Sequence, residues 1–208
     1  MTVEASGDLN IDKRMAEVVG KEPRIAPLSE DQLTDEAHQL AIEIRAAFGI
    51  PENGAMPESL RMMLVHPRLF KAQMTMGIAL AAGTIPPRER ELAVLRSAWI
   101  CGAPYEWGEH VDIGKQRAGL TAEEVERCTQ GSKAEGWSEQ DRAILKAVEE
   151  LHMRHTISDE TWAVLAKSWN DQQLTEFPLL VGIYTATAMQ QNSLRYRLAD
   201  NNPGLAHR

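Results

Sequence analysis

The stretch ELAVLRSAWICGAPYEWGEH, residues 91–110, is the most informative part of this chain. Its apolar residues run without alternation up to Gly102-Ala-Pro104, and Pro104 suits the first turn of a new helix. Glu106 and His110 are four residues apart, so both project from one face of that second helix. Glu91 lies on the first helix among apolar neighbours, which indicates burial. Buried carboxylates beside an imidazole are costly unless they are paired, and such pairs shift each other's pKa. The stretch therefore predicts two helices and a candidate site.

Helical periodicity continues on both sides of this stretch, and glycine and proline fall between the periodic segments. No segment alternates with a period of two, so the sequence predicts an all-α fold. A helix is expected to begin at Ser29, which forms a capping-box pattern with Gln32, and a restart is expected at His66-Pro67. Further helix starts are predicted at Thr121, Ser138, Ser158 and Asn170.

The predicted organisation is simple. Residues 1–28 are polar and irregular and are expected to form an N-terminal arm. Residues 29–200 are expected to form one helical domain, and residues 201–208 a C-terminal tail. A chain of 208 residues is long enough for one such core.

Composition excludes several classes of function. The formal net charge of −8 argues against nucleic acid and anionic membrane surfaces as partners. The sequence has no apolar run of 18 residues and no signal-peptide pattern at its start, so a cytoplasmic protein is expected. Cys101 and Cys128 form no Cys-x-x-Cys motif and no disulfide framework. His152-x-x-His155 has no evident third ligand, and no metal is expected.

Glu106 and His110 have the spacing of a general acid–base pair, in which the carboxylate orients the imidazole and raises its pKa. The alternative is an ordinary surface pair worth a few tenths of a kcal/mol. Glu91 is either a buried partner of this pair or a first-turn acid that favours its helix dipole. Both alternatives are open from spacing alone.

Arginine and aromatic residues surround these groups in the sequence. Arg88, Arg90 or Arg96 can neutralise Glu91 or bind a substrate carboxylate through two hydrogen bonds, or can lie on the solvated face. Tyr105 and Trp107, with Trp99, suit an apolar pocket wall, although core packing explains them equally well.

The run from Arg88 to Arg96, the Tyr-Glu-Trp-x-x-His motif ending at His110, and Ala118-Gly-Leu resemble the carboxymuconolactone decarboxylase family, which includes the alkylhydroperoxidase D-like proteins. The resemblance covers about residues 55–198. It implies a compact helical AhpD-like domain with a C-terminal helical extension.

In the peroxidase branch of that family, a Glu is followed after eleven residues by Cys-x-x-Cys and then by a His. Glu91 and His110 match the Glu and the His, but Ala103 and Glu106 occupy the two cysteine positions. A thiol peroxidase needs an attacking thiolate and a resolving thiol, so the chain resembles the decarboxylase branch better.

The resemblance implies a cofactor-free lyase that acts on a small acidic lactone or keto acid in the breakdown of aromatic compounds. His110 is then the proton donor, Glu106 orients it, and Glu91 is a second acid–base group. Arg88 or Arg96 holds the substrate acid, and Tyr105 and Trp107 line the pocket. The family also implies a homo-oligomer, a trimer or a hexamer. The alternatives are a thiol-dependent peroxidase-like protein and a non-catalytic oligomer that binds small molecules.

Overall fold

The computed structural model describes residues 9–208 and divides them into two compact units. The first unit contains residues up to 22 together with residues 83–208, and the second contains residues 23–82. These boundaries differ from those expected at 28/29 and 200/201. The described residues form ten α-helices and no strand, so the predicted all-α class is confirmed.

The second unit is a small helical core. It consists of the 3₁₀-helix η1 (Glu30–Gln32), α2 (Asp35–Phe48), α3 (Glu58–Met63) and α4 (Pro67–Ala81). The restart predicted at His66-Pro67 is confirmed, because His66 accepts a hydrogen bond from the backbone N–H of Leu69 and Pro67 opens α4. The buried core of this unit consists of Ala37, Leu40, Ala41, Ile44, Met56, Leu64 and Phe70.

The helix expected from Ser29 begins later. Ser29 and Gln32 do form the predicted capping box, but the box closes only η1. The long helix α2 starts at Asp35, because Thr34 is extended and its hydroxyl accepts from the backbone N–H of Ala37. Ser29 and Thr34 both carry capping signals, so the predicted start of the helix at Ser29 is six residues too early.

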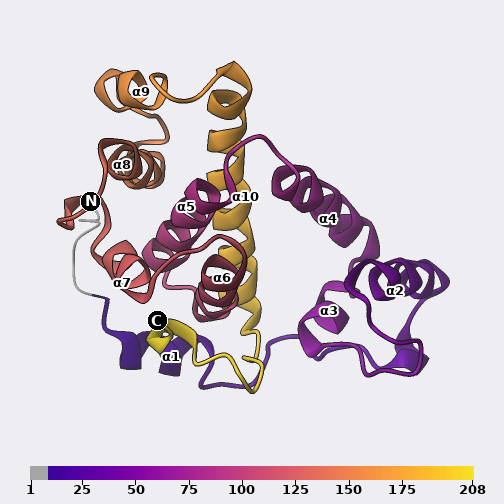
Figure 1. Ribbon diagram of the computed structural model, residues 1–208. Coiled ribbons are helices and arrows are strands. Elements are labelled where there is room, and N and C mark those ends of the chain that lie inside the picture. The colour runs from indigo at the N-terminus through magenta and orange to yellow at the C-terminus, as the bar shows by residue number, and fades with distance from the viewer. Residues whose placement is uncertain (1–8) are drawn as a thin grey trace. The chain divides into compact units, whose positions relative to one another are not determined.

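The first unit contains α1 (Ile11–Val18), α5 (Pro87–Ile100), α6 (Pro104–Arg117), α7 (Ala122–Gln130), η2 (Gly131–Lys133), α8 (Glu139–Arg154), α9 (Asp159–Leu165), α10 (Asp171–Leu194) and η3 (Gly204–Ala206). Helix α5 is its centre and contacts α6, α7, α8 and α10 (Figure 1). The eight consecutive residues from Glu91 to Ala98 are all buried, as expected for a helix surrounded by others.

Gly102 makes the reversal between α5 and α6 possible. Its φ of +51° lies in the left-handed region that side chains disfavour. Pro104 then opens α6, as predicted. Because of this turn, α6 returns alongside α5 and its residues face Glu91.

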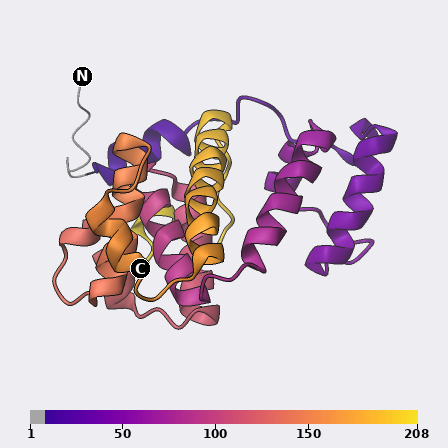
Figure 2. The same ribbon diagram turned by 90° about the horizontal axis from the view of Figure 1, so that it is seen from above.

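Helix α10 runs beside both α5 and α6, as Figure 2 shows from above. It begins at the predicted Asn170 cap and continues through Pro178 to Leu194. No helix among the described residues combines the length and the apolar character needed to cross a membrane.

The two ends of the described chain are more ordered than the sequence indicated. The expected irregular arm contains α1, which Asn10 caps and which buries Val18, whereas residues 1–8 of that prediction lie outside the described residues. The C-terminal tail buries Leu205 completely within η3, and η3 contacts α6 and α1.

Candidate active site

His110 lies between two carboxylates at the contact of α5 and α6. Its Nδ1 atom is 2.6 Å from Oε2 of Glu91, and its Nε2 atom is 3.3 Å from Oε1 of Glu106. His110, Glu91 and Glu106 are 9%, 1% and 6% exposed, respectively. We call Glu91, Glu106 and His110 the acid–imidazole cluster. The structure therefore brings together all three residues that the sequence proposed as catalytic.

Three further side chains surround the cluster. Arg90 donates from Nε to Oε1 of Glu91 at 3.2 Å. Gln191 of α10 donates from Nε2 to Oε2 of Glu106 at 2.6 Å. The ring of Tyr184, also on α10, meets the His110 ring edge-to-face with a centroid distance of 5.0 Å.

The cluster favours a protonated His110. Burial opposes the charge, but the neighbouring Tyr184 and the carboxylates of Glu106 and Glu91 outweigh it and raise the pKa of His110 well above its usual value. Burial likewise opposes ionisation of Glu91, yet His110 and then Arg90 lower the pKa of that carboxyl. Both imidazole nitrogens face carboxylate oxygens, which only an imidazolium can satisfy as a double donor. Two carboxylates thus face an imidazolium and a guanidinium.

The two sides of His110 differ. The contact with Glu91 is short, and its acceptor is almost completely buried, whereas the contact with Glu106 is long for a hydrogen bond. Glu91 therefore holds the Nδ1 side of the ring, and the Nε2 side is held less tightly. The division of roles is like that of a buried acid that orients a catalytic histidine.

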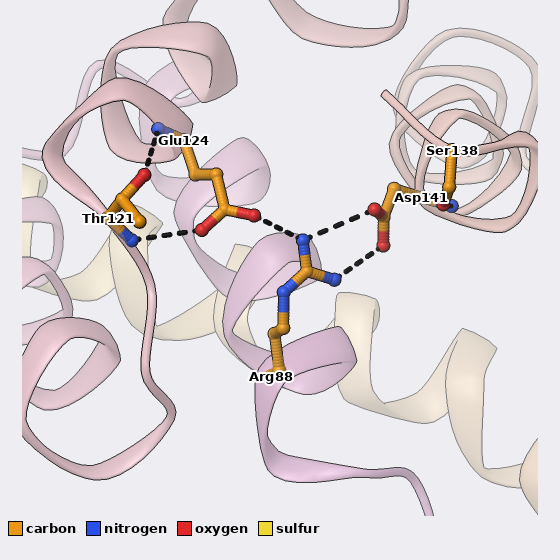
Figure 3. Close-up of polar contacts among 5 residues, drawn as sticks. All are labelled: Arg88, Thr121, Glu124, Ser138 and Asp141. Atoms are coloured by element: carbon orange, nitrogen blue, oxygen red, sulfur yellow. Dashed lines mark hydrogen bonds and ion pairs between the residues drawn. The ribbon is translucent and has the colours of Figure 1, made fainter. Parts of the chain in front are cut away.

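Arg88 lies outside the cluster, although the sequence proposed it as a substrate ligand. Figure 3 shows its guanidinium between Glu124 of α7 and Asp141 of α8. Nη1 and Nη2 bind the two oxygens of Asp141 at 2.7 Å and 3.2 Å. Thr121 and Ser138 cap the same two helices, so Arg88 ties α5 to the starts of α7 and α8.

The Arg96 side chain also binds groups outside the acid–imidazole cluster. Its Nε donates to Oε1 of Glu149 at 2.9 Å, and its Nη1 donates to the carbonyls of Cys128 and Thr129. Its side chain is almost completely buried in this network. Of the three arginines near Glu91 in the sequence, Arg90 is the one that contacts it.

The two aromatic residues proposed as pocket walls have other neighbours. Trp107 is completely buried, and its Nε1–H donates to the carbonyl of His207 at 3.0 Å. It packs against Trp99 with a ring-centroid distance of 4.9 Å. Tyr105 packs edge-to-face on Tyr196 at 5.7 Å. Trp107 thus belongs to the contact between α6 and the C-terminal segment.

Neither cysteine has the environment of a reactive thiol. Burial raises the pKa of Cys101 to about 11 and that of Cys128 to about 12. Cys128 is completely buried, and both thiols are free.

Sequence reasoning missed Tyr184 and Gln191 because they lie far from the motif. One signal was available: the two residues are seven apart, which places both on the same side of α10. Gln191 itself stands in a polar run with Gln190, Asn192 and Ser193, so its sequence neighbours did not mark it as buried.

Comparison with known proteins agrees with this fold. Residues 67–150 match the model of the carboxymuconolactone decarboxylase family. Among curated protein sequences, none is a significant match to the chain.

Several solved structures share the fold at low sequence identity. An alkylhydroperoxidase AhpD core, a peroxidase-related protein from Ralstonia eutropha JMP134, is 17% identical with a TM-score of 0.69; the match covers 86% of this chain and 93% of that one. A peroxidase-related protein from Silicibacter sp. TM1040 is 17% identical with a TM-score of 0.68, covering 88% and 95%. A variant of the debrominase Bmp8 in complex with 2,3,4-tribromopyrrole is 14% identical with a TM-score of 0.64, covering 87% and 94%. These likenesses show an AhpD-like fold.

Proposed function

Since residues 67–150 match the model of the carboxymuconolactone decarboxylase family, we propose that this chain is a cofactor-independent lyase that removes CO₂ from a small acidic lactone or keto acid. One observation carries the proposal. A buried imidazolium is held between two carboxylates in a cluster without a thiol. Such a group can deliver a proton to carbon where water is excluded.

In the proposed reaction the bond between the carboxylate carbon and its neighbour breaks and releases CO₂. The electron pair moves into the conjugated lactone or keto group of the substrate, which therefore needs no added electron sink. His110 then donates the proton from Nε2 to the carbon, and solvent restores it. The reaction consumes one proton for each CO₂ that leaves.

The residues of the cluster have separate roles in this proposal. Glu91 accepts the Nδ1–H bond and stabilises the charge on His110. In the resting protein Oε1 of Glu106 lies 3.3 Å from Nε2 of His110, and in this proposal it gives way when substrate arrives. Because both acceptors are buried, their attraction to the imidazolium is stronger than it would be in water.

The thiol-peroxidase alternative has less support. Ala103 and Glu106 occupy the positions where the Cys-x-x-Cys pattern would fall, and the raised pKa values of Cys101 and Cys128 disfavour thiolates. The second alternative is a non-catalytic binding protein. Turnover of any tested substrate would exclude it. A cytoplasmic location and a homo-oligomeric state, trimer or hexamer, stay predictions.

The test is a panel of carboxylated lactones and keto acids incubated with the purified chain in D₂O. We expect one substrate class to release CO₂ and to gain one carbon-bound deuterium, both measured by mass spectrometry. His110→Ala and Glu106→Gln should lower turnover by about 10²- to 10⁴-fold, the range for loss of a general acid or its partner.

Matched controls separate chemistry from folding. Glu135→Gln and His155→Asn change the same residue types at exposed positions and should turn over at the wild-type rate. Retention of full activity in His110→Ala, with the same helical content by circular dichroism, would overturn the proposal. Peroxide consumption that disappears in Cys101→Ser would favour the thiol alternative.

A further inference from the structure

Gln191 contacts the acid–imidazole cluster from outside the motif that defines it. Its Nε2 donates to Oε2 of Glu106 at 2.6 Å, across 85 residues of sequence. The residue is 7% exposed and lies on α10. The family match ends at residue 150, so this contact comes from a part of the chain that the match does not include.

The amide has a single orientation that suits an ionised Glu106. An amide nitrogen donates to a carboxylate oxygen, whereas the amide oxygen in the same place would repel it. With the nitrogen on Glu106, the Oε1 atom of Gln191 is buried and has no hydrogen-bond partner. A buried unsatisfied oxygen destabilises a fold, so a purely structural role would not explain this residue well.

The geometry of Glu106 explains what the contact achieves. Oε2 of Glu106 accepts from Gln191, and this leaves Oε1 to face Nε2 of His110. The two contacts use different oxygens of one carboxylate and fix its plane. Without the donor on α10, the carboxylate could rotate away from the imidazole.

We infer that Gln191 is a positioning residue of the candidate site, which holds Glu106 toward Nε2 of His110. Only the expected effect of Gln191 on turnover rests on the proposed function of the cluster. The hydrogen-bond geometry that it predicts can be measured without any substrate.

The experiment is NMR spectroscopy of the two ring N–H protons of His110 in the ¹⁵N-labelled protein. The variant is Gln191→Met, which keeps the length of the side chain and removes the donor. We expect the Nε2–H resonance to shift upfield, toward its position in Glu106→Ala, and to exchange faster with water. The Nδ1–H resonance, on the Glu91 side, should stay where it is. Gln190→Met changes the neighbouring residue in the same way and should shift neither proton.

Two other outcomes contradict the inference. An unchanged Nε2–H resonance in Gln191→Met means that Glu106 needs no support from α10. Loss of both resonances means that Gln191 holds the packing of α10 rather than one carboxylate. If the proposed function holds as well, turnover in Gln191→Met should fall by about 10- to 100-fold, as for other residues that orient a catalytic group. A shifted Nε2–H proton with no turnover in any variant would leave the inference standing and reject the function.

Discussion

The Nδ1 atom of His110 lies 2.6 Å from Oε2 of Glu91, although 19 residues and a helix reversal separate them. The contact is nearly completely buried, and it joins α5 to α6. Glu91 is thus the counter-ion that lets a histidine stay charged in the interior.

Replacement of this counter-ion should cost both stability and activity. In Glu91→Gln the imidazolium loses its closest anion, and breaking a buried ion pair costs about 3–5 kcal/mol. We expect the free energy of unfolding, measured with urea, to fall by roughly that amount. Turnover should fall by about 100-fold, because the ring is no longer held in place. A Glu91→Gln protein of wild-type stability would show that Glu106 alone supports the charge.

The pH dependence of stability follows from the same groups. The pKa of His110 is raised above its usual value of 6.5, so its contribution is complete below pH 6.5 and is lost as the pH rises through the folded-state pKa. The pKa of Glu91 is lowered from 4.5, so its contribution is complete above pH 4.5 and is lost as the pH falls through the lower folded-state value. Arg90, Glu106 and Tyr184 are the other charged or titratable groups facing the pair.

We therefore expect the stability difference between the wild type and His110→Gln to be largest between pH 4.5 and pH 6.5. It should decrease on both sides of that range. Urea unfolding at intervals of half a pH unit measures it. A difference that instead grows above pH 7 would mean that His110 is neutral in the folded protein.

Arg88 is expected to stabilise the fold and not to bind the substrate. Arg88→Met removes the bridge between Glu124 and Asp141, and we expect a loss of about 1 kcal/mol, because the arginine side chain is 36% exposed and partly screened. The Michaelis constant for the substrate should not change. A large rise in that constant, with little loss of stability, would restore the substrate-binding role that the sequence indicated.

The cysteines provide a chemical test of the thiol alternative. With a pKa raised to about 11, the Cys101 thiol should react slowly with a disulfide reagent in the native protein near pH 7.5. Unfolding in urea should expose both thiols to fast labelling. Rapid labelling of native Cys101, measured by absorbance, would contradict the burial that raises its pKa.

The local parts of this structure were predictable from the sequence because local chemistry determines them. His66 and Asn170 mark helix starts by accepting hydrogen bonds from backbone N–H groups, and Pro104 marks one through its fixed φ. The Glu106–His110 pair follows from helical geometry alone, and the addition of Glu91 needed the family resemblance. By contrast, Ser29 and Thr34 both suit a helix cap, and their competition depends on the surrounding fold.

The parts that the sequence does not settle depend on contacts between distant segments. Arg88, Arg96 and Trp107 lie near Glu91 or His110 in the sequence, but each side chain extends from its helix toward a different neighbour. A helix presents residues on all sides, so proximity in sequence does not predict which of them face one site. Gln191 is the opposite case, a residue remote in sequence that reaches Glu106.

The long separation between Glu106 and Gln191 has a consequence for synthesis on the ribosome. Helices α5 and α6 leave the exit tunnel well before α10, and the contact that spans 85 residues cannot form until α10 follows. Until then Glu106 and His110 lack the helix that carries Tyr184 and Gln191. Closure of distant segments is slow compared with helix formation. The candidate site is therefore among the last parts of the protein to assemble, and a nascent chain that stops before residue 184 would carry the motif without the activity we propose.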